Sequence, residues 1–318
     1  MGTREWITQQ IGAEALEQLS SGLSGTQLQS LLLEVMQQRA QRRSPADLMA
    51  QYQRDGFVQP AAADLRVSLT IDQHFLTVMP QFAAIELAPV APLGACSAVA
   101  LTTQQRVLSA LRSCEVVSDP TNLLALECAT RLRAHPERPV HLATSQRVVR
   151  AQPHPKLPGF APHFRLFALA SGGLEAKDHA FTVDTLTLHI RSMLAALDRV
   201  AAHGFRIGAR RVVLLATEQR DALAARVAET LRSSNIPIER ARLDHAYYSG
   251  GIRYQIWVAP QPTAAVPSEP EPELPMIDGG AFDWLTKLNA NRRAVFIASG
   301  AGTQLLALRF APTVNSQY

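Results

Sequence analysis

Short strand-like runs separated by irregular stretches constrain the fold of this chain more than any other feature of its sequence. Such runs occur in six places: residues 65–71, 141–150, 164–170, 212–216, 254–258 and 294–298. Helical patterns, with apolar residues three and four apart, separate some of them. The connections are too irregular for a strict strand–helix–strand repeat. The pattern therefore predicts an α/β (α+β) fold, in which a mixed, mainly antiparallel sheet of six or seven strands is flanked by helices.

The clearest helical patterns of the core are residues 185–202 and 222–231. Residues 1–63 carry a helical pattern of their own, with leucines three and four residues apart. Ser44 followed by Pro45 is typical of a helix start, because a capping hydroxyl precedes a proline in the first turn. We expect residues 1–63 to form a helical segment that packs on the core.

The core is expected to span residues 64–318. At its start, residues 65–71 alternate as a half-buried strand does. Near its end, residues 260–275 are rich in Pro, Ala and Glu and have few side chains to bury. This composition predicts an exposed loop.

The composition limits the class of protein. The net charge of +4 is mild, and the densest basic cluster fits a solvated helix end. The chain does not begin with a signal pattern, and it has no apolar run of the roughly 20 residues that a membrane span needs. The three cysteines, Cys96, Cys114 and Cys128, include no C-x-x-C pair. We expect a cytoplasmic protein, with no membrane contact and no zinc site.

A strand with a polar end marks the first candidate site. Arg150 ends one strand-like run and Gln152 follows it. A proline-rich loop then leads to His163 and Phe164, at the start of the next run. A guanidinium can bind two oxygens of one anion, so Arg150 is a candidate phosphate contact. Taken alone, the segment also fits a strand that simply ends in exposed polar residues.

Three further segments combine tyrosines or glycines with a neighbouring strand. Tyr247 and Tyr248 supply flat apolar walls with a hydroxyl at the rim, or they merely pack in a hairpin. Glycines allow a backbone to approach a ligand closely, although a glycine pair also fits a turn that ends a linker. The remaining candidates in these segments are Gly250, Gly279, Gly280, Asp283, Gly300 and Gly302.

Together and in this order, the four segments resemble the motifs of class II aminoacyl-tRNA synthetases. They are most similar to histidyl-tRNA synthetase, and the chain also resembles the regulatory subunit of short-form ATP phosphoribosyltransferase, a paralogue that does not charge tRNA. The resemblance covers roughly residues 80–308. It implies the class II synthetase-like sheet, a homodimer, a site for an amino acid, and ATP with Mg²⁺ as the cofactors of an active member.

The resemblance also implies a role for each segment. Arg150 would hold the α-phosphate of ATP, with Gln152 in place of the usual glutamate. The tyrosine pair and the first glycine pair would line the amino-acid pocket, and the last glycine-rich turn would lie beneath adenine. Glu86, Pro89 and Pro92 lie where the dimer-forming motif is expected.

The chain departs from the family pattern at three arginines. Ala281 stands in place of one, and Gln304 or Leu305 in place of another, while Arg309 lies too far along to substitute. The third arginine of the family pattern precedes the tyrosine pair, and Leu243 stands at its position, one residue after Arg242. A shift of one residue along a strand places a side chain on the opposite face. Loss of such a contact costs on the order of 2–5 kcal/mol. The chain also ends soon after the last segment, so we expect neither an anticodon-binding domain nor binding of full-length tRNA.

Three functions remain open from the sequence. The first is a paralogue that binds an amino acid or related small molecule without charging tRNA, in a regulatory role and with a possible partner protein. For it, Glu115, Asp119 and Glu127 are candidate amino-group contacts, although each also fits a solvated surface carboxylate. The second is an ATP-dependent, adenylate-forming ligase that transfers a carboxylate to an acceptor other than tRNA. The third is a structural subunit with a vestigial pocket.

Overall fold

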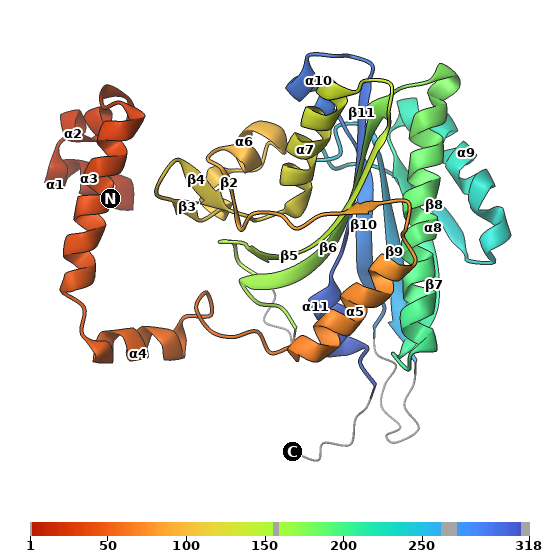
Figure 1. Ribbon diagram of the computed structural model, residues 1–318, viewed down its shortest axis with the longest axis horizontal. Helices are drawn as coiled ribbons and strands as arrows, with labels where there is room; N and C mark the ends of the chain where they lie inside the picture. Colours follow the sequence, from red (N-terminus) through yellow and green to blue (C-terminus); the bar gives the residue numbers. More distant parts are fainter. Residues whose placement is uncertain (1, 155–158, 262–271, 313–318) are drawn as a thin grey trace.

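A computed structural model describes residues 2–154, 159–261 and 272–312 of the chain. An eight-stranded sheet forms the centre of this part (Figure 1). Across the sheet, the strands follow the order β1 (Ala83–Ala84), β5 (Val140–Val149), β6 (His163–Leu174), β11 (Ala294–Ala301), β10 (Leu274–Phe282), β9 (Ile252–Pro260), β7 (Ile207–Ala216) and β8 (Ile238–Arg242). Only the two edge pairs, β1–β5 and β7–β8, are parallel. The predicted mixed, mainly antiparallel sheet is confirmed.

The sequence pattern predicted neither the edge strands β1 and β8 nor β10, so the sheet has eight strands instead of the six or seven expected. Strand β10 lies inside the sheet. It contains Asp278, Gly279 and Gly280, a sequence typical of a turn. The strand nevertheless pairs along its length with β9 on one side and β11 on the other. Both ladders of hydrogen bonds include Gly279 and Gly280, and this pairing offsets the low strand propensity of the glycines. Most of the predicted loop 260–275 lies outside the described residues, but Pro260 ends β9 and Pro275 lies in β10.

Helices cover both faces of the sheet (Figure 1). One face carries α5 (Leu65–Thr77), α8 (Ala180–Ala202), α9 (Asp221–Leu231) and α11 (Thr303–Arg309). The other face carries α6 (Ala95–Val99), α7 (Pro120–Ala134) and α10 (Trp284–Asn289). Beside α6 and α7 lies a small antiparallel sheet of β2 (Val90–Pro92), β4 (Cys114–Val116) and β3 (Ser109–Ala110). Each face of the main sheet thus has its own apolar core.

The prediction of a strand at residues 65–71 is wrong, because these residues begin helix α5. Oδ1 of Asp64 caps the helix by accepting a hydrogen bond from the backbone N–H of Arg66 at 2.7 Å. The buried residues Ile71 and Phe75 are four apart, as on one helix face. Seven residues are too few to separate a period of two from a period of 3.6, and Phe75 lies beyond the stretch that suggested a strand.

The N-terminal helices are α1 (Thr3–Ile11), α2 (Ala13–Glu17), the short π-helix η1 (Gln18–Gly22), α3 (Gly25–Gln41) and α4 (Pro45–Arg54). Ser44 caps α4 as predicted, since its Oγ accepts from the backbone N–H of Asp47 at 3.2 Å. None of these helices buries a side chain, and Figure 1 places them to one side of the sheet. The expected packing of α1–α4 on the core stays a prediction. The linker that follows does touch the core, where His163 Nε2 lies 2.7 Å from the carbonyl oxygen of Gln59.

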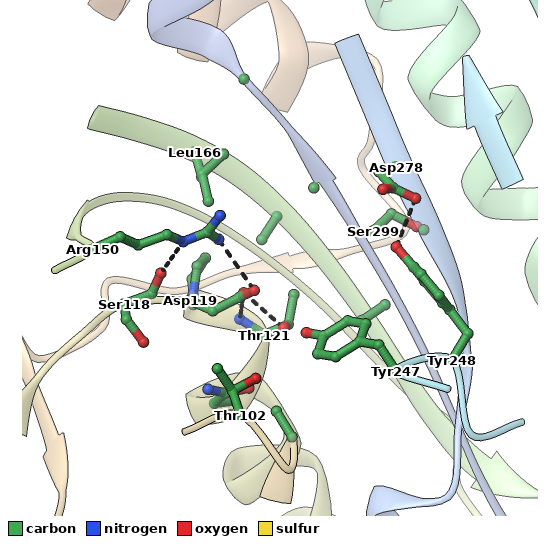
Figure 2. Close-up of a pocket in the computed structure, with 18 of the residues that line it drawn as sticks. Thr102, Ser118, Asp119, Thr121, Arg150, Leu166, Tyr247, Tyr248, Asp278 and Ser299 are labelled. Atoms are coloured by element: carbon green, nitrogen blue, oxygen red, sulfur yellow. Dashed lines mark hydrogen bonds and ion pairs between the residues drawn. The ribbon is translucent and has the colours of Figure 1, made fainter. Parts of the chain in front are cut away.

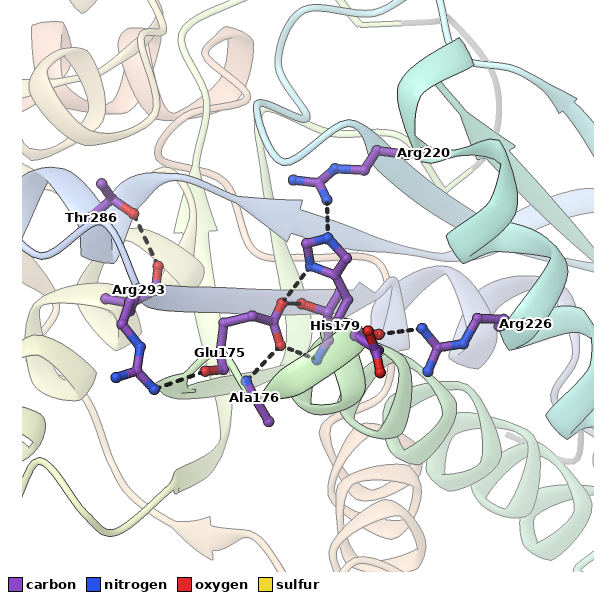
Figure 3. A network of polar contacts seen from close by, with 10 residues as sticks. Glu175, Ala176, His179, Arg220, Arg226, Thr286 and Arg293 are labelled. Carbon is purple, nitrogen blue, oxygen red and sulfur yellow. Dashed lines mark hydrogen bonds and ion pairs between the residues drawn. The ribbon is translucent and has the colours of Figure 1, made fainter.

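The start of α8 is held by a polar network at the end of β6 (Figure 3). The Glu175 carboxylate accepts hydrogen bonds from the backbone N–H of Thr182 at 3.3 Å and from Nδ1 of His179 at 3.1 Å. His179 in turn lies 3.2 Å, through Nε2, from Nη1 of Arg220. Arg220 also packs beneath Gly251, whose φ of +78° only glycine adopts easily. The network therefore supports the turn that carries the tyrosine pair.

Candidate functional site

A cavity of about 470 Å³ opens on the face of the sheet that carries α7 (Figure 2). Its walls come from segments far apart in the sequence: the loop around α6, the start of α7, the end of β5, the tyrosine turn, and strands β6, β9, β10 and β11. The cavity brings together all four segments singled out in the sequence. Of the candidate residues, those that line it are Asp119, Arg150, Gln152, Tyr247, Tyr248, Gly279, Gly300 and Gly302.

Arg150 extends from the end of β5 across one wall. Its Nε donates to the carbonyl oxygen of Ser118 at 2.9 Å, and its Nη2 lies 3.4 Å from Oδ2 of Asp119. Its guanidinium carbon lies 5.1 Å from the centre of the Phe164 ring. These contacts hold the side chain in place, and among the described residues Nη1 has no hydrogen-bond partner, so it can meet an anion.

Asp119 is the cap of helix α7. Its Oδ1 accepts from the backbone N–H of Thr121 at 3.0 Å and from Oγ1 of Thr121 at 2.7 Å. Ser118, Asn122 and the proline between them also line the cavity. The sequence reading named Asp119 only as one of three possible carboxylates. A capping residue followed by a proline is typical of a helix start. The stretch Asp119-Pro120-Thr121 therefore predicts that Asp119 caps the N-terminus of a helix.

Tyr247 and Tyr248 form the opposite wall. Figure 2 shows the hydroxyl end of Tyr247 directed toward Thr121, whereas Tyr248 points toward Asp278 and donates to its Oδ1 at 2.7 Å. Burial raises the pKa of both phenols, and nearby Asp278 raises that of Tyr248 further. Both side chains therefore act as neutral hydroxyls.

Arg253 is a cavity residue that the sequence reading missed. It lies on β9, opposite Gly280 of β10, and forms a two-point ion pair with Asp278. Its hydrogen bonds to Asp278 raise the pKa of Arg253. Alternation along residues 252–258 marks Arg253 as lying on the face opposite Tyr254, but no sequence signal identifies that face as a cavity. The arginine that was considered, Arg242, is exposed at the edge strand β8 and pairs with Asp244.

Comparison with known proteins gives matches in structure alone. No protein-family model matches the chain, and no curated protein matches it. One similar structure is an ATP phosphoribosyltransferase regulatory subunit/histidyl-tRNA synthetase from Bacillus halodurans, with a TM-score of 0.56, 14% identity, and coverage of 76% of this chain and 78% of that one. A histidine–tRNA ligase subunit from Alicyclobacillus acidocaldarius has a TM-score of 0.55 and 12% identity, and the match covers 79% of this chain and 96% of that one. A putative threonyl-tRNA synthetase from Aeropyrum pernix has a TM-score of 0.56 and 12% identity, with coverage of 76% and 59%.

The fold is that of the class II aminoacyl-tRNA synthetases. The expected resemblance is confirmed at the level of fold. At 12–14% identity the likeness says nothing further about ligands or reaction. Within the described part of the chain, no helix combines the length and apolar character needed to cross a membrane, and no group of three or more potential ligands is arranged to hold a metal ion.

Next to the cavity, a second hollow of about 260 Å³ extends past Arg150. It is lined by Phe164, a further candidate residue, and by Phe160, Gln304 and Leu305. Gln304 is buried, and its Oε1 accepts from Nη1 of Arg147 at 3.2 Å. Helix α11 therefore presents an amide and a leucine to this hollow. Arg309 lines neither cavity and lies at the far end of the helix.

Gly280 lies beneath the tyrosine wall without lining the cavity. A Cβ there would come within 2.6 Å of Cδ1 of Tyr248 and 2.4 Å of the carbonyl oxygen of Ile252. Its neighbour Ala281 is buried in the core on the α8 face and accepts from the backbone N–H of Gly250 at 3.0 Å. An arginine side chain at position 281 would thus begin on the face away from the cavity.

Two other candidate residues, His163 and Asp283, make contacts within the fold and do not line the cavity. His163 lies on the α5 face, 2.9 Å from Nη1 of Arg147, because strand alternation places it opposite Phe164. Asp283 accepts from Ser249 Oγ at 2.6 Å and pairs with Lys287, outside the cavity.

The two other carboxylates considered in the sequence also lie elsewhere. Glu115 is buried and accepts from the backbone N–H groups of Gly94 and Cys96, both at 2.8 Å. Glu127 pairs with Arg131 on α7. Of the three acidic candidates, only Asp119 lines the cavity.

Proposed function

We propose that this chain binds an amino acid, or a related small zwitterion, in the larger cavity and does not charge tRNA. One observation carries the proposal: a carboxylate and a guanidinium, those of Asp119 and Arg150, share one wall and are only loosely paired, at 3.4 Å. A zwitterion can separate such a pair, placing its ammonium on Asp119 and its carboxylate on Arg150. The hydroxyl of Tyr247 lies on the ammonium side and can accept a hydrogen bond from it.

The polar ends of the site suit a small ligand. The ammonium would contact Oδ2 of Asp119, because Oδ1 is already engaged by Thr121. The carboxylate would contact Nη1 of Arg150. The flat faces of Tyr247 and Tyr248 would cover the carbon chain, and Gly300 leaves room beside it, since a Cβ there would meet nothing within 4 Å.

The charge around the second hollow supports binding without adenylation. Transfer of an adenylyl group needs positive groups at both ends of the triphosphate. Arg150 is available at one end, whereas helix α11 offers Gln304 and Leu305 at the other. Arg165 also lines this hollow, but its Nη1 is paired with Oδ2 of Asp72 at 3.1 Å. We therefore infer a regulatory or sensing role for a homodimer in the cytoplasm, acting with a partner protein. One structural neighbour is itself described as a regulatory subunit.

Thermal unfolding of the purified chain tests the proposal. The midpoint would be measured with each of the twenty amino acids, with Mg-ATP, and with both. A ligand at 100 times its dissociation constant adds about 2.7 kcal/mol to the free energy of unfolding. We expect a rise with at least one amino acid in the absence of ATP. The rise should disappear in Arg150→Gln and persist in the control Arg131→Gln, which changes an arginine outside the cavity. If no amino acid raises the midpoint, the proposal is wrong.

The second hollow favours one alternative, an ATP-dependent ligase that activates a carboxylate for an acceptor other than tRNA. It adjoins Arg150 and has an aromatic wall at Phe164 that could cover a planar base. Exchange of radiolabelled pyrophosphate into ATP, with histidine and then with every ligand found by thermal unfolding, tests this. We expect no exchange above background. Exchange that Arg150→Ala abolishes would replace the binding function with the enzymatic one.

A further inference from the structure

The charges that line the larger cavity do not balance. Three guanidinium groups line it, those of Arg106, Arg150 and Arg253, against two carboxylates, those of Asp119 and Asp278. The ring of His245 also lines it and accepts a hydrogen bond through Nδ1 from the backbone N–H of Tyr247 at 3.1 Å, as a neutral imidazole can. The described wall therefore has an excess of one positive charge.

One of the ion pairs is closed to a ligand. Arg253 donates to both oxygens of Asp278, from Nε at 2.9 Å and from Nη2 at 2.6 Å. Tyr248 donates to Oδ1 of the same carboxylate. Because both oxygens are engaged, Asp278 neutralises Arg253 and has little capacity left for a ligand cation.

The excess therefore lies on the wall shared by Arg150 and Arg106. Oδ1 of Asp119 accepts the hydrogen bonds that cap α7, and Oδ2 makes a long contact with Arg150 at 3.4 Å. The side chain of Arg106 makes no hydrogen bond or ion pair in the described chain. The backbone joins the two arginines, because the carbonyl oxygen of Arg106 accepts from the N–H of Ala151 at 2.8 Å. Arg106 and Arg150 thus line the cavity from adjoining stretches of backbone. Of the two carboxylates of the cavity, Asp119 is the one that contacts Arg150, and it already accepts hydrogen bonds from Thr121.

We infer that the natural ligand is an amino acid that carries a second acidic group, with a net charge of −1. This inference rests on the proposed amino-acid site. The α-carboxylate binds Arg150, the ammonium binds Asp119, and the second acid binds Arg106, so that the ligand neutralises the wall. A carboxylate and a phosphate share the required chemistry, since both present two or more oxygens to a guanidinium.

Titration calorimetry with matched ligand pairs tests the charge directly. The pairs are L-glutamate with L-glutamine, L-aspartate with L-asparagine, and O-phospho-L-serine with L-serine; L-lysine and L-histidine complete the set. We expect one acid to bind about tenfold or more tightly than its neutral counterpart, because hydrogen bonds between ions are roughly twice as strong as neutral ones. Its affinity should also fall as salt is added. The pair that responds identifies the acid as carboxylate or phosphate.

Arg106→Gln should reduce that preference to near unity by lowering the affinity for the acid. Arg112→Gln is the control, since this exposed arginine lies in the turn after β3 and outside the cavity. Equal affinity for acid and amide, or tighter binding of lysine or histidine, would overturn the inference while leaving the proposed function intact. If neither O-phospho-L-serine nor any of the twenty amino acids binds, the proposed function itself fails.

Discussion

Arg253 on β9 and Asp278 on β10 are diagonal neighbours in the sheet, and their ion pair ties the floor of the cavity to its tyrosine wall. Nε and Nη2 of the arginine lie 2.9 Å and 2.6 Å from the two carboxylate oxygens. The guanidinium carbon also lies 5.0 Å from the centre of the Tyr248 ring, whose hydroxyl donates to the same aspartate. The three side chains form one closed unit.

The first prediction concerns this unit. Asp278→Ala leaves a half-buried guanidinium and a buried hydroxyl without their acceptor, so we expect a loss of about 1–3 kcal/mol in the free energy of unfolding. A double-mutant cycle with Arg253→Gln, measured by urea unfolding, should show positive coupling. The exposed pair Glu229–Arg232 is the control and should show no measurable coupling. Equal coupling in both cycles would contradict the closed unit.

Two glycines of the site are expected to respond differently to alanine. Gly280→Ala should destabilise the chain by about 1–3 kcal/mol, since its Cβ would meet backbone and the Tyr248 ring. Gly300→Ala should leave stability nearly unchanged, because nothing lies within 4 Å, yet weaken ligand binding by filling part of the cavity. Unfolding and calorimetry on both variants provide the check. A stable Gly280→Ala protein would show that the tyrosine wall can shift.

His189 should make the fold sensitive to acid. It is fully buried between Ser171 and Ser299, and burial lowers its pKa to about 3. The neutral ring therefore contributes stability above its unfolded pKa of about 6.5, and this is lost as the pH falls toward 3, at about 1.4 kcal/mol per pH unit. Stability between pH 6.5 and 4 should fall less steeply in His189→Gln. The exposed His135→Gln should keep the wild-type slope; equal slopes in all three proteins would rule out this role.

Buried tyrosines should produce the opposite response in alkali. Burial raises the pKa of Tyr247, Tyr248 and Tyr254. Their contribution to stability is complete below the unfolded value of about 10 and is lost as the pH rises above it. Tyrosinate absorbance should therefore appear together with unfolding. Tyr254→Phe should make the loss of stability above pH 10 less steep, and Tyr52→Phe should not. Ionisation of Tyr254 in the folded chain would refute this.

We also predict a homodimer in solution. Apolar side chains are exposed on and beside the small sheet, at Val90, Leu93, Leu101 and Leu108. Closed twofold dimers are the commonest way to cover such a surface. Static light scattering should give about twice the single-chain mass of 34.7 kDa. Leu93→Glu should shift the mass toward the monomer, whereas Leu33→Glu, an equivalent change on α3, should not. A wild-type mass of 34.7 kDa would contradict the prediction.

The sequence by itself determined the local structure where one period dominates over a long enough stretch. Residues 141–150 and 164–170 predicted β5 and β6 because strand residues alternate between two faces. Ser44 and Pro45 predicted the start of α4 because capping depends on neighbouring residues only. The order of the four motif-like segments was enough to suggest the class II fold.

Tertiary structure decided what depends on distant neighbours. Strand β10 exists because β9 and β11 pair with it on both sides, although its glycines favour a turn. Residues 65–71 became helix because α5 buries Ile71 and Phe75 against the sheet. The cavity itself joins Asp119, Arg150 and Arg253, which are separated by 31 and 103 positions in the chain. Side chains so far apart meet only through the order of the strands, which no local pattern encodes, and so the charge of the cavity could be counted only in the folded protein.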